Sequence, residues 1–167
     1  MLRNLIAFPL LALVVIVQSA IVSQMTLLSS YADLMLVVLA AWALKADASS
    51  AWLWAILGGI MVSFVSAMPW PVAMTGYLFV VLLAQLFKQR VWQAPLLAMF
   101  SVIFLGTLSM DILALLMLNL LGTPLPLGDT LGLVVLPRVL LNLLFSVPVY
   151  AVVRDLAHWA SPVKEVE

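Results

Sequence analysis

The sequence predicts an all-α integral membrane protein, with residues 1–167 forming a single domain of six transmembrane helices. Composition is the first reason, because the chain is 66% hydrophobic and 8% charged, whereas soluble domains carry about 25% charged residues. Apolar stretches also recur from end to end, at lengths near the ~20 residues that a spanning helix needs. Finally, Lys and Arg are confined to alternate connections between these stretches.

The apolar stretches place the expected helices. The fourth stretch is short, and the second reaches spanning length only if it includes Asp33. The first could be misread as a signal peptide, but an uncleaved span is the simpler interpretation because everything after it is also apolar. The expected spans are approximately 4–24, 28–45, 51–68, 72–87, 95–118 and 131–153.

The distribution of positive charge gives the expected orientation. Lys and Arg precede the first span and follow the second, fourth and sixth, whereas the other three connections contain neither. By the positive-inside rule, both termini are cytoplasmic, which agrees with an even number of spans. The residues concerned are Arg3, Lys45, Lys88, Arg90, Arg154 and Lys164, and the uncharged connections are 25–27, 69–71 and 119–130.

Several functional classes are disfavoured. A formal charge of zero gives no field that would attract nucleic acid. The absence of cysteine excludes disulfides and thiolate metal sites, and the single His158 has no second histidine. No HExxH motif is present, and no histidine lies within a span to serve a serine nucleophile. Asp33 and Asp111 could meet as an aspartyl pair, but no motif flanks them. We therefore expect a non-catalytic protein without metal or cofactor.

A stripe of small residues marks the third span. Five of them recur every four residues, which forms a groove that lets another helix approach closely. The neighbour could belong to the same chain, which is the simpler interpretation, or to a partner protein. The residues are Ala51, Ala55, Gly59, Ser63 and Ala67.

Asp33 has two possible roles at the start of the second span. Ser30 at the N-cap and Asp33 in the first turn would form an acidic variant of the capping box. An acid there also suits the helix dipole. A functional contact is the alternative, and the sequence does not separate the two.

Asp111 and Arg138 lie at matching depths in the fifth and sixth spans. Each is about seven residues, or roughly 10 Å, from the outer end of its helix. A short acidic side chain cannot reach the headgroups from there, so Asp111 should face protein and pair with something. We expect an Asp111–Arg138 pair, with snorkelling of Arg138 to the headgroups as the alternative.

The last span has further unusual residues on the Arg138 side. Asn142 and Ser146 follow at intervals of four, so all three share one face that should be turned to protein. Pro137 and Pro148 each free the carbonyl four residues earlier for another donor. This polar seam could be purely structural or could contact a partner helix.

The chain resembles two families of membrane protein. Six helices with short loops resemble the substrate-binding subunits of energy-coupling-factor vitamin transporters, whose small-residue docking faces could correspond to Ala51/Ala55 and Ala94/Ala98. Against this, the outer loops are poor in polar groups to hold a vitamin.

More residues resemble the rod shape-determining MreD family. The segment "ADLMLVVLAAWAL", 32–44, is similar to that family's second span, which often begins Pro-Asp-Leu. Residues 91–116 resemble its fifth span, which can carry an aspartate where Asp111 stands. Residues 136–156 are similar to its last span, with Asn142, Pro148 and Tyr150 in place. The similarity covers most of the chain, although Ala32 replaces a common proline and the third span lacks an aspartate that many members have.

The MreD resemblance implies an interaction role in a multi-pass protein of the bacterial inner membrane. The expected six-helix fold resembles that of energy-coupling-factor substrate-binding subunits. The implied partner is a single-span MreC-like protein, together with RodA, penicillin-binding protein 2 and, indirectly, MreB. No chemistry is assigned to such a subunit, so the expected function is a scaffold for lateral peptidoglycan synthesis. The residues singled out for the polar seam or a partner contact are Asp33, Asp111, Arg138, Asn142 and Pro148.

Overall fold

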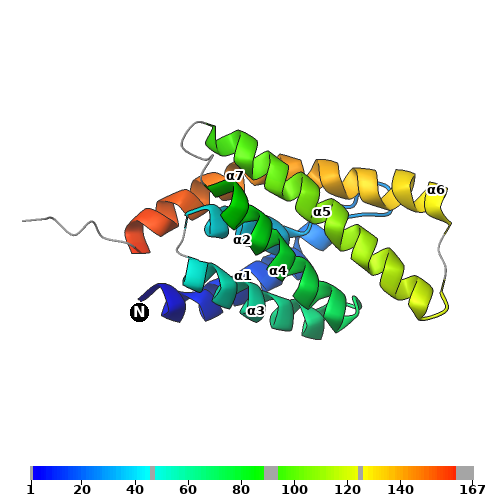
Figure 1. Ribbon diagram of the computed structural model, residues 1–167, viewed down its shortest axis with the longest axis horizontal. Coiled ribbons are helices and arrows are strands. Elements are labelled where there is room, and N and C mark those ends of the chain that lie inside the picture. The colour runs from blue at the N-terminus through cyan, green and yellow to red at the C-terminus, as the bar shows by residue number, and fades with distance from the viewer. Residues whose placement is uncertain (1, 46–47, 89–93, 124–125, 161–167) are drawn as a thin grey trace, which may run out of the picture.

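Long apolar helices run back and forth through the whole protein (Figure 1). The computed structural model describes residues 2–45, 48–88, 94–123 and 126–160. Arg90 and Lys164 of the predicted orientation lie outside these residues. The main helices are α1 (Leu2–Ala20), α2 (Leu34–Lys45), α3 (Ala48–Val65), α4 (Trp70–Phe87), α5 (Pro95–Leu120) and α7 (Leu136–Ala160), with the short η1 (Val22–Gln24), α6 (Leu127–Thr130) and π-helical η3 (Leu131–Val135).

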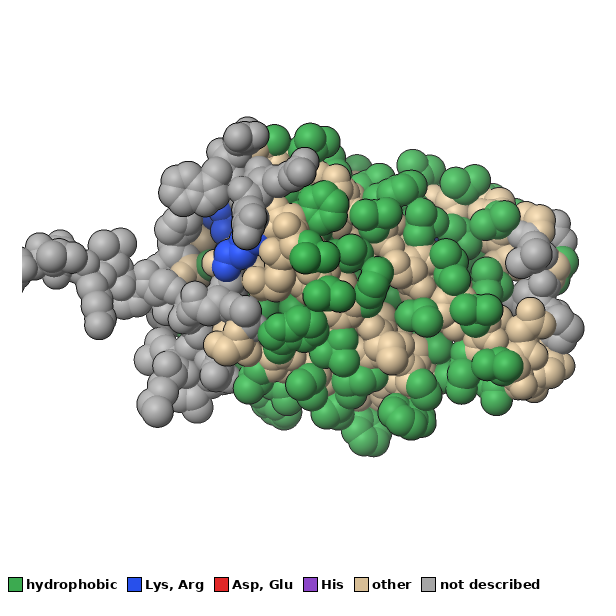
Figure 2. Space-filling model, in the orientation of Figure 1, with side chains coloured by type: hydrophobic (Ala, Val, Ile, Leu, Met, Phe, Trp, Pro, Cys, Tyr) green, Lys and Arg blue, Asp and Glu red, His purple; other side chains and the backbone are tan. Residues whose placement is uncertain are grey.

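Four of these segments are long and apolar enough to cross a membrane. Within the described residues they lie in the α1–η1 segment, α4, α5 and the η3–α7 segment, and their length and composition indicate a membrane protein. Figure 2 shows hydrophobic side chains across the middle of one face, with Lys and Arg side chains at one end. We call this end, where α1 begins and α7 ends, the terminal end (Figure 1). The opposite end, which carries residues 21–33, 66–69 and 121–123, is the loop end.

The second predicted span is the one that differs most from the structure. Residues 28–33 are not helical, and α2 begins only at Leu34. Its 12 residues rise about 18 Å, which is short of the ~30 Å hydrocarbon core. The chain reaches this start through a tight turn in which Leu27 and Ser30 form an isolated bridge and Leu28 adopts a positive φ of 55°.

α2 is the central helix of the bundle. Every residue from Leu34 to Leu44 is buried, because α1, α3, α4, α5 and α7 all pack around it. Such an all-round apolar helix has no preferred face. Trp42 stacks on Trp54 of α3, with ring centroids 3.9 Å apart and planes inclined by 11°. The helices that surround α2 must therefore also supply hydrogen-bond partners for the backbone groups at its ends.

The small-residue stripe of α3 packs within the chain over part of its length. Ala51 and Ala55 are fully buried, and a Cβ built on Gly59 would lie 3.2 Å from Cα of Met74 in α4. This close approach confirms the simpler interpretation for these positions. Ala67 was wrongly included, because α3 ends at Val65 and Ala67 is exposed in the following bend.

α7 begins with a local irregularity at Pro137. The proline cannot donate to the carbonyl of Leu133, and the preceding residues form the π-helical η3. The backbone N–H of Ser29 donates to that carbonyl at 3.2 Å. The expectation that Pro137 frees an acceptor for another segment is confirmed, and the contact joins the 21–33 connection to α7.

A buried polar cluster at the start of α2

The start of α2 lies inside the bundle and must find hydrogen-bond partners there. The first N–H groups of any helix have no partner within that helix. Water is absent from the hydrocarbon region, so an unsatisfied N–H in it costs several kcal/mol. Ala32 and Leu34 are buried on either side of Asp33. Side chains from several helices must therefore supply acceptors.

Three side chains supply them. Oδ1 of Asp33 accepts the N–H of Leu36 at 3.0 Å, which is N-capping geometry. Oε1 of Gln18 in α1 accepts the N–H of Met35 at 3.1 Å. Oδ1 of Asn142 in α7 accepts the N–H of Asp33 at 2.7 Å. The cap is thus Asp33, and the expectation that Ser30 would be the cap is wrong because the helix starts later.

Asp33 also makes a contact across the bundle. The hydroxyl of Tyr77 in α4 lies 3.2 Å and 3.1 Å from the two carboxylate oxygens and donates to them. Tyr77 is 1% exposed. Asp33 therefore caps α2 and also joins it to α4, whereas a functional contact at Asp33 stays a prediction.

Asn142 connects three helices. Its Oδ1 binds the backbone at the start of α2, and its Nδ2 donates to Oγ1 of Thr107 in α5 at 2.9 Å. Asn142 and Thr107 are both fully buried. Asn142 therefore faces protein, as the sequence predicts, and so does Ser146, which is also buried and donates to the carbonyl of Leu143.

Asp111 and Arg138 form the predicted ion pair. Nη1 of Arg138 lies 2.5 Å from Oδ1 of Asp111, and the two side chains are 18% and 6% exposed. The pair joins α5 to α7 one helical turn beyond the Asn142–Thr107 bond on both helices. Snorkelling of Arg138 is excluded by this geometry. The second carboxylate oxygen, Oδ2 of Asp111, is buried and has no hydrogen-bond partner.

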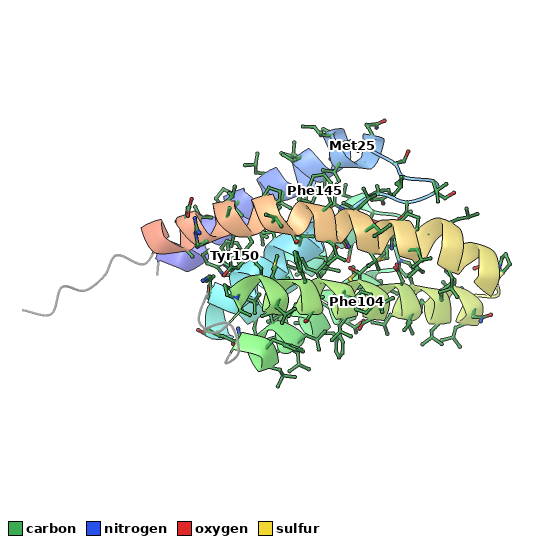
Figure 3. All side chains as sticks on the ribbon, turned by 90° about the horizontal axis from the view of Figure 1, so that it is seen from above. Met25, Phe104, Phe145 and Tyr150 are labelled. Atoms are coloured by element: carbon green, nitrogen blue, oxygen red, sulfur yellow. The ribbon has the colours of Figure 1, made fainter. Side chains whose placement is uncertain are left out.

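Pro148 does not belong to this cluster. It is exposed on α7 and lines an apolar groove of about 360 Å³ between α1 and α7. Phe145 lines the same groove, and Figure 3 shows α7 between α1 and α5. Pro148 is not one of the buried residues because it lies on a different face of α7 from Asn142 and Ser146, and a partner contact at Pro148 stays a prediction.

The sequence analysis missed three members of the cluster. Gln18, Tyr77 and Thr107 each lie within an apolar helix and supply a hydrogen-bonding group. Thr107 precedes Asp111 by four residues, so it shares the face of α5 that carries the acid. That spacing could have revealed it. Gln18 and Tyr77 have no such signal, because their partner is the backbone or cap of a helix whose start was misplaced.

Two cavities open near the cluster at the loop end. One of about 290 Å³ is lined by Asp111 and Arg138, together with parts of α5, η3 and residues 66–69. The other, of about 240 Å³, is lined by Gln18, Ser19 and other residues of α1 and α3. Tyr31 and Ser66 line both cavities and therefore stand between them.

The cluster is a structural network of hydrogen bonds that borders cavities at the loop end. The carboxylate of Asp33 is engaged by Tyr77 and Leu36, and that of Asp111 by Arg138. Among the described residues, no group of three or more His, Cys, Asp or Glu could hold a metal ion. The ion pair borders the cavity of about 290 Å³, and Gln18 borders the one of about 240 Å³.

Comparison with known proteins adds no relative. No family model matches the chain, and no curated protein or solved structure is significantly similar to it.

Proposed function

We propose that this protein is a non-catalytic scaffold subunit of the bacterial cell-elongation complex, which synthesises lateral peptidoglycan, and that it binds an MreC-like single-span partner. One observation carries the proposal. The polar residues through which three segments resemble the MreD family, Asp33, Asp111 and Asn142, lie in one region of the bundle and bind neighbouring helices. Apolar segments of unrelated membrane proteins can resemble one another through leucine content alone. A resemblance carried by polar residues that lie close together in the structure is more specific.

A scaffold role agrees with how these polar groups are used. The Asp33–Tyr77 hydrogen bond, the Asn142 amide bridge and the Asp111–Arg138 ion pair each join different helices. A rigid bundle presents its lipid-facing surface and loops in fixed positions, which a partner requires. In this proposal the protein lies in the inner membrane with six spans and both termini cytoplasmic. RodA and penicillin-binding protein 2 are further partners, and MreB is an indirect one.

Co-purification tests the partner. The tagged full chain is expressed in rod-shaped bacteria, solubilised in a mild detergent, and analysed by mass spectrometry after affinity capture. We expect an MreC-like protein in stoichiometric amount. A matched capture with an unrelated six-span membrane protein controls for detergent carry-over. Repeated absence of any MreC-like protein from the eluate would refute the proposal.

Reporter fusions test the six-span topology separately. Alkaline phosphatase, which is active outside the cytoplasm, and a green fluorescent protein, which is active inside it, are fused after residues 45, 68, 88 and 122. We expect fluorescence at 45 and 88, and phosphatase activity at 68 and 122. The α2 segment is the critical one, because its helix has only 12 residues. Phosphatase activity at 45 would show that α2 does not cross.

A substrate-binding subunit of an energy-coupling-factor transporter is the second candidate. The cavity beside Asp111 and Arg138 favours it, since a transporter needs a site that opens to the outer side. Burial of Ala51 and Ala55 counts against it, because both are 0% exposed and are not available to a coupling subunit. Tight binding of a vitamin by the purified protein in detergent would decide for the transporter.

A further inference from the structure

The cavity at the loop end is built around a charged floor. It has a volume of about 290 Å³, near the lower limit of ~300 Å³ for ligand pockets. Ala114, Leu115 and Leu118 of α5 form an apolar wall. The polar residues that line it are Tyr31, Ser66, Asp111, Thr130 and Arg138.

The floor has unused hydrogen-bonding capacity of both kinds. Asp111 is 5% exposed, and its Oδ2 is buried without a partner. Buried polar side-chain atoms normally have at least one hydrogen-bond partner, so Oδ2 is an exception. Arg138 carries five N–H donors, and among the described residues its hydrogen bond is the one from Nη1 to Asp111. A small rotation of the carboxyl group, which is soft about its last torsion, turns Oδ2 towards the cavity that Asp111 lines.

We propose that this cavity binds a zwitterion with a primary ammonium and an anionic group a few bonds apart, as in the headgroup of phosphatidylethanolamine. The ammonium donates to Oδ2 of Asp111, and the anionic group accepts from the free guanidinium N–H groups of Arg138. This proposal is independent of the scaffold function and goes beyond it.

Charge balance selects a zwitterion over a simple ion. The Asp111–Arg138 pair is neutral as a whole, so a lone anion is repelled by Asp111 and a lone cation by Arg138. These repulsions are strong where the local dielectric is low. A ligand with both charges satisfies both partners and leaves the buried site neutral. A quaternary ammonium lacks the N–H that Oδ2 requires, so choline headgroups should bind more weakly.

The depth of the floor suits a headgroup from the adjacent leaflet. α5 has 26 residues, which corresponds to about 39 Å, so it exceeds the ~30 Å hydrocarbon core. Asp111 lies nine residues before the end of this helix and is therefore closer to the interface than that spacing suggests.

Native mass spectrometry of the full-length detergent-solubilised protein tests the proposal. Phosphatidylethanolamine, phosphatidylcholine and phosphatidylglycerol with identical acyl chains are added in turn. We expect about tenfold higher occupancy by phosphatidylethanolamine, since one charge-assisted hydrogen bond contributes about that factor. Equal occupancy by the three lipids would overturn the proposal.

Two variants locate the binding. Ala114→Phe fills the cavity without removing either charge and should abolish the preference, whereas Ala151→Phe on an exposed part of α7 is a matched control that should keep it. The double variant Asp111→Asn/Arg138→Gln keeps a neutral floor and should also lose the preference. A preference that survives Ala114→Phe in a folded protein would place the lipid elsewhere and refute the proposal.

Competition identifies the source of the zwitterion. Millimolar O-phosphoethanolamine should displace phosphatidylethanolamine if the headgroup alone is recognised, and should fail if the acyl chains are also required; both results support the zwitterion class. If Ala114→Phe abolishes capture of an MreC-like partner but leaves lipid preference unchanged, the cavity holds a partner segment and the zwitterion proposal is wrong. A protein that shows no lipid selectivity could still capture an MreC-like partner. The zwitterion proposal and the scaffold proposal can therefore fail separately.

Discussion

Oδ1 of Asn142 accepts the backbone N–H of Asp33, the residue that caps α2, at 2.7 Å, and Nδ2 of Asn142 donates to Thr107. One side chain of α7 therefore supplies a hydrogen-bond acceptor at the start of α2 and also binds α5. This bond spans 109 positions of the sequence. It explains why an asparagine lies in the middle of an apolar helix: α2 begins where water cannot satisfy its N–H groups.

Replacing Asn142 with leucine should destabilise the protein strongly. The substitution leaves the N–H of Asp33 and the hydroxyl of Thr107 without their partner in a buried site, and each such group costs about 1–3 kcal/mol. We expect a free-energy loss of about 3 kcal/mol in denaturation by SDS from mixed micelles. Asn119→Leu is the matched control, because Asn119 is exposed near the end of α5. Equal stability of the two variants would contradict the bridging role.

The two roles of Asp33 can be separated by comparing two substitutions. Asp33→Asn keeps a side-chain oxygen that caps α2 and accepts from Tyr77, so we expect a loss below about 1 kcal/mol. Asp33→Ala removes the cap and leaves the Tyr77 hydroxyl and the Leu36 N–H unpaired, for a loss of about 2–4 kcal/mol. Thermal stability in detergent measures the difference. A loss for Asn as large as that for Ala would show that the carboxylate charge, and not capping, is what matters.

The Asp111–Arg138 pair should show strong coupling in a double-mutant cycle. Asp111→Asn or Arg138→Gln alone leaves an uncompensated charge that is mostly buried, and we expect a loss of about 2–4 kcal/mol for each. The double variant should be more stable than the less stable single variant, by at least half of the stability which that variant loses, because a buried pair adds little net stability. Unfolding free energies of the three variants and the parent test this. Strictly additive losses would show that the pair does not couple.

Close helix contacts at two glycines predict that alanine substitutions there destabilise the protein to different degrees. A Cβ on Gly106 would lie 2.8 Å from Cγ2 of Val80, a stiff β-branched side chain. On Gly76 it would lie 2.6 Å from Cγ and 2.7 Å from Sδ of Met110, whose unbranched side chain has more rotamers than that of valine. We expect Gly106→Ala to lose about 2–3 kcal/mol and Gly76→Ala about 1–2 kcal/mol.

Gly132 provides the control for that series, since a Cβ there meets nothing within 4 Å. Gly132→Ala should be neutral or slightly stabilising, because alanine restricts the unfolded chain. Melting temperatures of the three variants in one detergent give the order. A Gly76→Ala variant that is less stable than Gly106→Ala would show that Met110, and not Val80, is the more constrained neighbour.

The amino-acid sequence by itself determined the all-helical membrane class and the main ion pair. Apolar length alone separates the helices, because lipid leaves an isolated segment no other way to satisfy its backbone. Asp111 and Arg138 could be paired in advance, since consecutive antiparallel helices bring equal distances from a shared loop to equal depth. Pro137 likewise indicated a free carbonyl before its donor was known.

Only the tertiary structure decided where α2 begins and what holds it there. Residues 28–33 were counted as part of the second span, yet acceptors from α1 and α7 make a later start, at Leu34, favourable. No periodicity within a segment reveals a partner that lies 109 residues away. Tyr77 was unrecognisable for the same reason, and Pro148 lies apart from the buried residues because residues six apart on a helix lie on different faces. Hydropathy selects the segments that enter the membrane, whereas hydrogen bonds between distant segments determine how they fit together inside it.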